Sequence, residues 1–340
     1  DEKTSSQSGL VVLTNNNTYT GGTTVDGGTL KLTGSGSIGN GGLTVNNGGT
    51  FSIANDDYNS LGGALTVNEG GTLSTDSTGG GNAHNIGAIT LNGGTLSSSG
   101  NTWSEGNWIL NGDVTVGGSA LSTISGLAVG SKSGGGTYNV ADSVAGAGTD
   151  LLVSAEIKLG SLTKTGTGTM ELTGTGSYTG DTTVSEGTLS LASSYTHTGT
   201  GAFIVEGGTL NIADDVDITS SSMTISLGGV ISPGNSPGTA ITGNQTWNDG
   251  GAYLWEINDM AGGEGVDSGW DWLDIQGTLD ISATFDILIT SLTNPGNVSG
   301  LADGFDYTGF AYLDPYGSVT IATATGGVTG FDASAFNLDD

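Results

Sequence analysis

A short motif recurs along the chain, and its spacing limits the fold more than any other feature of the sequence. Each copy has Val or Leu, then a glycine-rich turn, then Thr followed by Leu or Phe. The copies are TVDGGTLKL (24–32), TVNNGGTFSI (44–53), TVNEGGTLST (66–75), TLNGGTLSS (90–98), TVSEGTLSL (183–191) and IVEGGTLNI (204–212). Their shared threonines recur at a nearly constant spacing, apart from one interval close to four periods. A period near 22 is too short for a pair of helices, but it suits one coil of a β-solenoid.

Alignment of the copies predicts columns of apolar side chains that face inward. Residues between these columns are mainly Thr, Ser, Asn and Asp, as expected for the solvent-facing side of a strand. The predicted core ladder consists of Val25, Val45, Val67, Leu91, Val184 and Val205 in one column, and Leu30, Phe51, Leu73, Leu96, Leu189 and Leu210 in another. We therefore expect each coil to bury its inner face by stacking on the next coil.

A longer internal match carries a resemblance to a known family. The segment LTNNNTYTGGTTVDGGTLKL (13–32) aligns with LTGTGSYTGDTTVSEGTLSL (172–191). The string Y-T-G-x-T-T-V-x-x-G-T-L from Tyr178 to Leu189 resembles the autotransporter-associated β-strand repeat of bacterial passenger regions. The resemblance implies a right-handed parallel β-helix, export, and a role as stalk, adhesin or surface layer. It covers about 10–227, with residues 100–170 degenerate.

The composition of the sequence changes near residue 228. The segment GGVISPGNSPGT (228–239) holds two of the four prolines in a Ser, Gly and Asn setting, which indicates a turn-rich boundary. We expect three parts: a polar N-terminal tail (1–9), β-solenoid repeats (10–227) and an aromatic-rich, acidic β C-terminal region (228–340). The fold class predicted is all-β, a parallel solenoid of about 22 residues per coil. We expect a β-rich end domain to follow the solenoid.

The charge of the chain disfavours several classes of partner. Five Lys, no Arg and 34 Asp plus Glu give a net charge of -29, and residues 165–340 contain no Lys or Arg. Phosphate backbones and anionic membrane surfaces would be repelled, so we expect no nucleic-acid partner. Cations or a basic partner remain compatible with this charge.

Composition narrows the class of protein further. Glycine accounts for 65 of 340 residues, yet only 4 prolines are present and 34% of residues are hydrophobic, which fits neither collagen nor a wholly disordered chain. No apolar run approaches the roughly 20 residues of a membrane helix, so we expect no membrane insertion by this chain. We expect an extracellular or bacterial cell-surface location, after removal of a signal peptide.

Parallel β-helices also include enzymes, so a carbohydrate-binding or carbohydrate-cleaving module is the alternative function. Trp255, Trp270 and Trp272 are the candidate carbohydrate contacts, because indole rings stack on sugar faces. A glycoside hydrolase needs two carboxylates, and Asp267, Asp271 and Asp274 form the best candidate cluster. The competing interpretation is that the aromatic side chains simply pack in a core.

Nucleophilic catalysis is disfavoured by the small number of candidate bases. His84 and His197 are the two histidines, both lie in loop-like sequence, and neither has a nucleophile-elbow motif nearby. The chain has 0 cysteines, which removes thiolate nucleophiles and thiolate metal ligands. We predict that the chain is not an enzyme.

Calcium is the one cofactor that the sequence leaves open. Carboxylates and carbonyl oxygens suit Ca²⁺, and the weak candidate ligands are Asp214, Asp215, Asp217 and Asp267. The string GGEGVD (262–267) matches the start of a calcium-binding nonapeptide, but no tandem copy follows it.

These observations lead to a functional expectation. We expect a non-enzymatic exported structural protein, acting as a surface stalk or adhesin or as a self-assembling extracellular fibre subunit. The candidate partners are surface glycans, cations and further copies of the chain in head-to-tail contact, because the ends of a solenoid expose unpaired strand edges.

Overall fold

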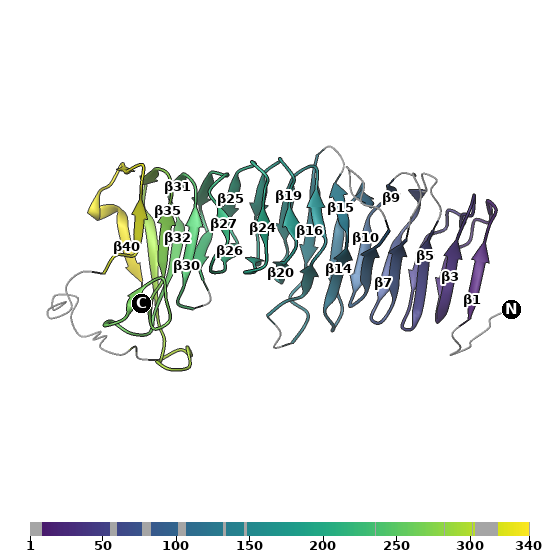
Figure 1. The fold of residues 1–340 in the computed structure, drawn as a ribbon, viewed down its shortest axis with the longest axis horizontal. Coiled ribbons are helices and arrows are strands. Elements are labelled where there is room, and N and C mark those ends of the chain that lie inside the picture. Colours follow the sequence, from purple (N-terminus) through teal and green to yellow (C-terminus); the bar gives the residue numbers. More distant parts are fainter. Residues whose placement is uncertain are drawn as a thin grey trace. The chain divides into compact units, whose positions relative to one another are not determined.

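The computed structural model describes residues 9–54, 60–76, 83–100, 107–131, 134–145, 148–234, 236–281, 283–300, 302 and 319–339. Residues 1–8 of the predicted polar tail lie outside the described residues. Two compact units, Asp1–Gly180 (unit 1) and Asp181–Asp340 (unit 2), make up the chain. Strands dominate both units (Figure 1).

Unit 1 is a stack of coils, and each sheet takes one strand from successive coils (Figure 1). Sheet A contains β1 (Leu10–Leu13), β3 (Gly28–Leu32), β5 (Gly49–Ile53), β8 (Thr72–Thr75), β11 (Thr95–Ser98), β14 (Ser122–Gly126), β17 (Leu151–Val153) and β20 (Thr169–Leu172). Sheet B contains β2 (Thr23–Val25), β4 (Leu43–Val45), β7 (Leu65–Asn68), β10 (Ile89–Asn92), β13 (Val114–Gly117), β16 (Gly136–Val140) and β19 (Leu162–Thr165). Sheet C contains β6 (Ser60–Leu61), β9 (His84–Ile86), β12 (Trp108–Leu110), β15 (Ala128–Ser131), β18 (Glu156–Lys158) and β21 (Thr175–Gly176).

Unit 2 repeats this plan, and its sets of strands are called sheets D, E and F here. Sheet D contains β23 (Thr188–Leu191), β26 (Thr209–Ile212), β29 (Val230–Pro233), β32 (Gly251–Ile257), β37 (Phe285–Ser291) and β40 (Phe336–Asp339), and β33 (Gly263–Glu264) and β34 (Gly269–Trp270) branch from β32. Sheet E contains β22 (Thr182–Val184), β25 (Phe203–Glu206), β28 (Met223–Ser226), β31 (Gln245–Trp247), β36 (Leu279–Ile281) and β39 (Val328–Thr329). Sheet F contains β27 (Asp217–Ile218), β30 (Thr239–Thr242), β35 (Trp272–Ile275) and β38 (Ala322–Ala324). The short strand β24 (Thr196–His197) precedes β25, and η1 (Ala333–Ala335) is a single 3₁₀ turn.

The strand register shows how the repeat builds the fold. Leu30 pairs with Phe51, Phe51 with Leu73, and Leu73 with Leu96, so equivalent positions of successive motif copies are register partners. These pairs are parallel, as the coils of a solenoid require. The predicted all-β solenoid, with one motif copy per coil, is therefore confirmed.

The paired glycines of the motif have two different tasks. Gly70 has a φ of +72°, a left-handed backbone conformation that glycine adopts without a steric penalty. At Gly71, an added Cβ would lie 2.6 Å from the carbonyl oxygen of Val45 on the preceding coil. The first glycine therefore turns the chain from sheet B to sheet A, and the second allows the coils to approach.

The solenoid continues past residue 228, where the sequence suggests a boundary. Met223 of β28 pairs with Gln245 of β31, and Gln245 pairs with Leu279 of β36, all in parallel register. The motif becomes irregular in this region, with Thr278-Leu279 at β36 and Thr284-Phe285 at β37, but the alternation of inward apolar residues persists, as in Leu279 and Ile281. The alternation, rather than the signature, is what a coil needs to bury its inner face.

Candidate functional site

The residues of the predicted core ladder line the interior of each unit. Val25, Val45, Val67 and Leu91 are successive register partners in sheet B, and Val184 and Val205 are partners in sheet E. Leu189 pairs with Leu210 in sheet D. All residues of the ladder are buried except Leu30, which is half-buried and lies one strand from the end of sheet A.

The tryptophans proposed as carbohydrate contacts are mostly interior. Trp255 is 3% exposed and its Nε1 donates to the Asp271 carbonyl at 2.9 Å, while Trp270 is 8% exposed and donates to the Thr320 carbonyl at 3.0 Å. Trp272 is half-buried in β35. An indole ring that is enclosed by protein has no face for a sugar, so this prediction is wrong for Trp255 and Trp270.

The carboxylates proposed for sugar hydrolysis are occupied by structural contacts. Asp271 is fully buried, and its two oxygens accept from the backbone N–H groups of Gly238 (2.8 Å) and Glu256 (2.9 Å). Burial raises the pKa of Asp271 well above its ordinary value. A carboxyl that solvent does not reach cannot act on a polysaccharide, which removes the key member of the proposed cluster.

The calcium candidates do not converge on one site. Asp214 accepts from Thr239 N at 2.7 Å, and Asp267 accepts from the side-chain amides of Asn258 (2.6 Å) and Asn297 (2.9 Å). Throughout the described ranges, no three His, Cys, Asp or Glu side chains gather so as to hold a metal ion. Calcium binding therefore stays a prediction.

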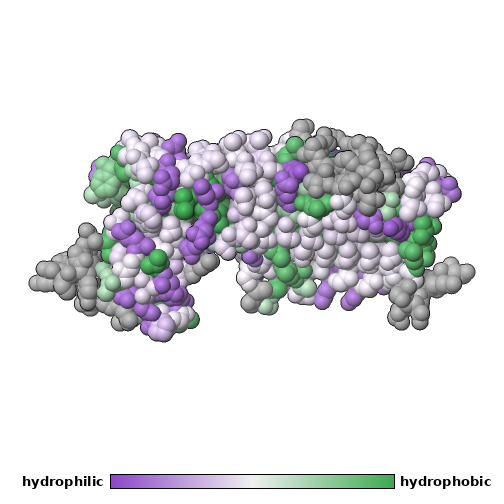
Figure 2. Space-filling view, in the orientation of Figure 1, coloured by the Kyte–Doolittle hydropathy of each residue, from purple (hydrophilic) through white to green (hydrophobic). Residues whose placement is uncertain are grey.

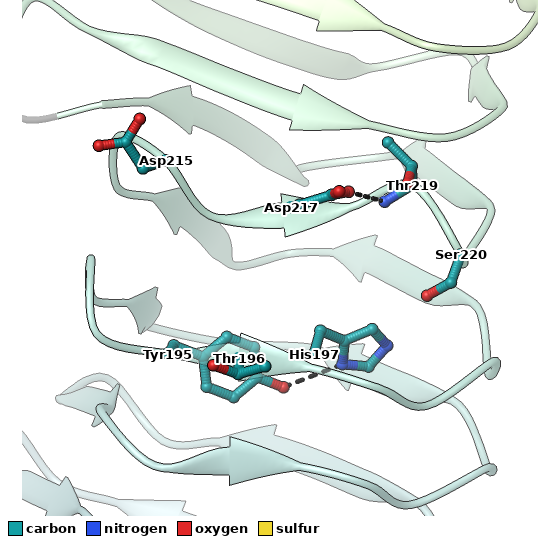
Figure 3. A pocket seen from close by; sticks show the side chains of 7 residues that line it. All are labelled: Tyr195, Thr196, His197, Asp215, Asp217, Thr219 and Ser220. Carbon is teal, nitrogen blue, oxygen red and sulfur yellow. Dashed lines mark hydrogen bonds between the residues drawn. The ribbon is translucent and has the colours of Figure 1, made fainter.

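Asp215 and Asp217 instead line a pocket of unit 2 with a volume of about 310 Å³ (Figure 3). One coil supplies Tyr195, with Thr196 and His197 of β24. The next coil supplies Asp215, Asp217, Thr219 and Ser220 around β27. Figure 3 shows the two groups facing each other across the pocket, with Asp217 on β27, Asp215 at the bend before it, and Tyr195 and His197 at β24.

His197 is fixed in this pocket by two hydroxyl groups. The Tyr195 hydroxyl lies 3.0 Å from Nδ1 and the Ser221 Oγ lies 3.0 Å from Nε2. Burial lowers the pKa of His197, so the ring is neutral at pH 7. A neutral imidazole has one donor and one acceptor, and the two hydroxyls satisfy either tautomer.

This arrangement differs from a hydrolase triad. A triad requires an accessible serine and a carboxylate that orients the histidine. Here Ser221 is 4% exposed and a phenol occupies the place of the carboxylate. The two hydroxyl contacts of His197 therefore hold its ring in place, and they do not form the arrangement that nucleophilic catalysis requires. His84, the other histidine, is buried beside the ring of Trp108.

Neither this pocket nor a ladder of amide side chains in unit 1 was predicted from the sequence. Asn92 Nδ2 donates to Asn68 Oδ1 (3.0 Å), Asn68 donates to Asn46 (2.7 Å), and Asn46 donates to Asp26 (2.5 Å). These residues each follow the last apolar residue of a sheet B strand, so the recurrence of Asn and Asp once per motif copy was the available signal. For the pocket, the signal was that Tyr195 and Asp217 lie one period apart in the sequence.

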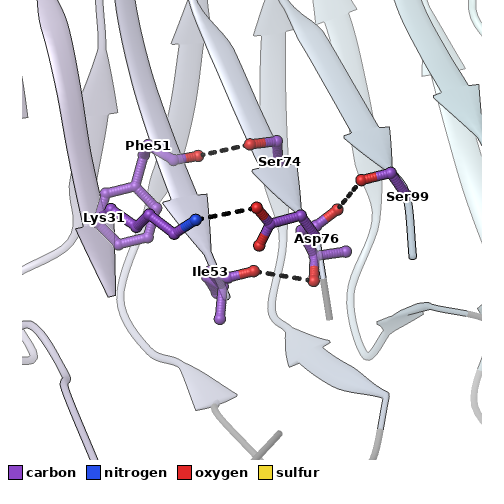
Figure 4. Close-up of polar contacts among 7 residues, drawn as sticks. Lys31, Phe51, Ile53, Ser74, Asp76 and Ser99 are labelled. Atoms are coloured by element: carbon purple, nitrogen blue, oxygen red, sulfur yellow. Dashed lines mark hydrogen bonds and ion pairs between the residues drawn. The ribbon is translucent and has the colours of Figure 1, made fainter. Parts of the chain in front are cut away.

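A second set of contacts joins coils on the outer face of sheet A (Figure 4). Lys31 Nζ forms an ion pair with Asp76 Oδ2 at 3.0 Å, across the intervening coil. Ser74 Oγ donates to the Phe51 carbonyl (3.4 Å), and Ser99 Oγ donates to the Thr75 carbonyl (3.3 Å). Short hydroxyl side chains therefore serve as links between coils.

No helix in the described part of the chain has the length and apolar character needed to span a bilayer. A comparison with curated proteins gave no match. Among solved structures, the chain is similar to the crystal structure of the TibC-catalyzed hyper-glycosylated TibA55-350 fragment, with 15% identity, coverage of 96% of this chain and 97% of that chain, and a TM-score of 0.40.

A sequence model of the passenger-associated-transport-repeat family matches the chain at residues 6–32 and 162–191. These segments include the string from Tyr178 to Leu189 and its counterpart from Tyr19, which first indicated the resemblance. The resemblance is therefore confirmed: the chain is a β-solenoid that carries repeats of the autotransporter passenger type.

Proposed function

We propose that the chain is a non-enzymatic protein of the bacterial surface, in which passenger-type repeats form the body of a stalk or adhesin. The match at residues 6–32 and 162–191 carries this proposal, because repeats of this type accompany exported passenger regions. The burial of Asp271 and of Ser221 supports a non-enzymatic role, because solvent barely reaches either side chain.

Protease treatment of intact cells tests the location. Cells that produce the chain are treated with an external protease and then probed with an antibody raised against the purified chain. We expect the signal to disappear before lysis. A signal that disappears only after lysis contradicts the surface location, and turnover of a glycoside panel by purified protein contradicts the non-enzymatic role.

An exposed strand edge favours assembly into a fibre as a second role. Among the described strands, β1 pairs only with β3, and β40 pairs only with β37. Leu10, Val11 and Val12 of β1 are 63%, 57% and 44% exposed, and they contribute to the hydrophobic surface at this end of unit 1 (Figure 2). An unpaired edge with apolar side chains is a template for another strand. The proposed occupant is β40 of a second copy, which would continue the coil in head-to-tail contact.

Light scattering at increasing protein concentration tests this contact. We expect association that rises with added salt or Ca²⁺, because screening reduces repulsion between chains of net charge -29. Val11→Lys places a charge at the edge and should abolish association. The matched control Leu227→Lys changes another exposed apolar residue, at a turn of unit 2, and should not. A protein that stays monomeric, or equal loss in both variants, overturns head-to-tail pairing.

A further inference from the structure

The pocket at β24 and β27 has a lining in which hydrogen-bonding groups surround a partly aromatic wall. Thr196, Thr219 and Ser220 contribute hydroxyl groups, and Asp215 and Asp217 contribute carboxylates. The half-buried His197 contributes a ring to the lining, and the buried Tyr195 ring lies behind it, roughly parallel and 6.1 Å away. The pocket thus combines hydrogen-bond acceptors, hydroxyl groups that can donate or accept, and the partly exposed ring of His197.

The carboxylates of this pocket have no lysine or arginine side chain in unit 2 to pair with. Residues 181–340 contain no Lys or Arg. Asp217 Oδ1 accepts from Thr219 N at 2.8 Å, which fixes the side chain at the pocket wall. Asp215 is exposed and lies at a turn with a φ of +66°. The local backbone therefore positions both carboxylates in the lining of the pocket.

The imidazole ring of His197 forms part of the pocket wall without adding a charge to it. His197 is neutral at pH 7, and both of its ring nitrogens face hydroxyl groups at 3.0 Å. The rings of His197 and Phe203 also pack in an edge-to-face arrangement, with centroids 5.2 Å apart. This wall is held rigidly, so a ligand meets a preformed surface.

The size and polarity of the pocket narrow the class of ligand. A volume of about 310 Å³ is at the lower end of the range of about 300–1,000 Å³ for small-molecule sites, which suits a single sugar ring. Sugar hydroxyls donate well to carboxylates, because hydrogen bonds to an ionised acceptor are roughly twice as strong as neutral ones. Uronic acids and other anionic sugars would be repelled by the same two groups.

We propose that this pocket binds one uncharged sugar ring, with Asp215 and Asp217 accepting hydrogen bonds from its hydroxyls. The inference deepens the proposed adhesin role, on which it rests, by naming the class of glycan that the surface protein recognises. The proposed carbohydrate contact therefore lies at residues 195–220 and not at the buried tryptophans.

Saturation-transfer NMR and calorimetry on the full-length chain test the proposal with defined probes. The uncharged probes are glucose, galactose, mannose and N-acetylglucosamine, the anionic probe is galacturonic acid, and the cationic probes are CaCl₂ and methylammonium. We expect at least one uncharged sugar to bind with a Kd on the order of 1 mM, as is usual for a small polar ligand, and galacturonic acid to give no signal.

Conservative variants identify the site of binding. Asp217→Asn keeps an acceptor for Thr219 N, and Asp215→Asn places at a positive φ a residue that tolerates it. Each should weaken sugar binding about tenfold, since a charge-assisted hydrogen bond is lost. Asp259→Asn is the matched control, because Asp259 Oδ1 accepts from Ala261 N at 2.8 Å in the same local geometry outside the pocket.

The outcomes separate this inference from the proposed function. Sugar binding that is lost in both pocket variants and kept in Asp259→Asn supports the inference. The absence of binding by any uncharged sugar, equal weakening by Asp259→Asn, or a response to the cationic probes alone overturns it. Protease treatment of intact cells is independent of sugar binding, so failure of the inference leaves the surface location standing.

Discussion

Leu73 shows at the scale of one residue how the repeat stabilises the fold. Its side chain is fully buried between its register partners Phe51 and Leu96. The neighbouring Thr72 pairs with Thr50 and Thr95 and is half-buried on the opposite side of the strand. Inward and outward positions that are adjacent in the sequence therefore differ greatly in their tolerance to substitution.

Leu73→Ala should lower the free energy of unfolding by about 2–5 kcal/mol, because it removes buried apolar atoms and leaves a cavity in the core. Thr72→Ser should change it by less than about 0.5 kcal/mol. Thermal unfolding followed by circular dichroism measures both. Equal stability of the Leu73 variant and the wild type would show that the inward column is assigned incorrectly.

The buried Asp271 should give the stability of the fold an unusual dependence on pH. Burial raises its pKa in the folded protein, so between its ordinary pKa of about 3.9 and its folded pKa, the folded state holds a proton that the unfolded state has lost. The contribution of Asp271 to stability is therefore largest at low pH and decreases as the pH rises through the folded pKa.

Replacement of Asp271 by Asn should remove this slope, because the amide stays neutral at every pH. The comparison is chemical denaturation of wild type and Asp271→Asn at several pH values between 4 and 8, with exposed Asp249→Asn as control. As the pH rises, we expect the wild type to lose stability relative to Asp271→Asn, so that the unfolding free energy of the variant minus that of the wild type increases. A pH-independent difference would contradict the assignment.

At the scale of elements, the fold and the site differ in how much the sequence could predict. The columns in sheets A, B, D and E were predictable, because the strand alternation and the coil spacing together specify which side chains face inward. The burial of Trp255 and Trp270 was not, since an alternating strand does not reveal which of its faces another segment covers. Asp271 shares the inward face of its segment with Leu273 and Ile275, against the hydrophobic pattern.

The pocket and the amide ladder were missed for a related reason. Both depend on short side chains that meet only when successive coils stack in an exact register. Lys164 was similarly unexpected, because a lysine in the buried face of β19 requires partners for its ammonium, and the carbonyl oxygens of Thr165 and Gly166 accept from Nζ at 3.0 and 2.7 Å. Backbone acceptors of this kind leave no signature in the sequence.

The amide ladder should act as a coupled element. Asn46→Ala and Asn68→Ala each remove a member of one hydrogen-bonded chain, so their effects should not add. A double-mutant cycle should give a coupling of about 0.5–1.5 kcal/mol, the usual net value of one hydrogen bond. Chemical denaturation of the two single variants and the double variant measures it. Additive effects would mean that the two amides stabilise their coils independently.

At the scale of the whole molecule, stability rests on the stacking of coils rather than on covalent or ionic links. The chain has 0 cysteines, and no disulfide restrains its unfolded state. In the described residues, the ion pairs are Lys31–Asp76 and Lys158–Glu156, and both lie in unit 1. The four side chains are only partly buried, and ion pairs near the surface contribute about 0–1 kcal/mol. Each coil therefore depends on its neighbours, as expected for a solenoid.

Cysteine cross-linking measures that stacking most directly, because the natural chain contributes no competing thiol. Thr66 and Thr90 are register partners on adjacent strands, so their Cα atoms lie about 4.8 Å apart, within the disulfide range of about 4.4–6.8 Å. Thr44 and Thr90 are separated by one further coil, at about 10 Å, which is too far. After mild oxidation, mass spectrometry should find an intramolecular disulfide in Thr66→Cys/Thr90→Cys and none in Thr44→Cys/Thr90→Cys. A cross-link in the second pair, or its absence in the first, would contradict the in-register solenoid.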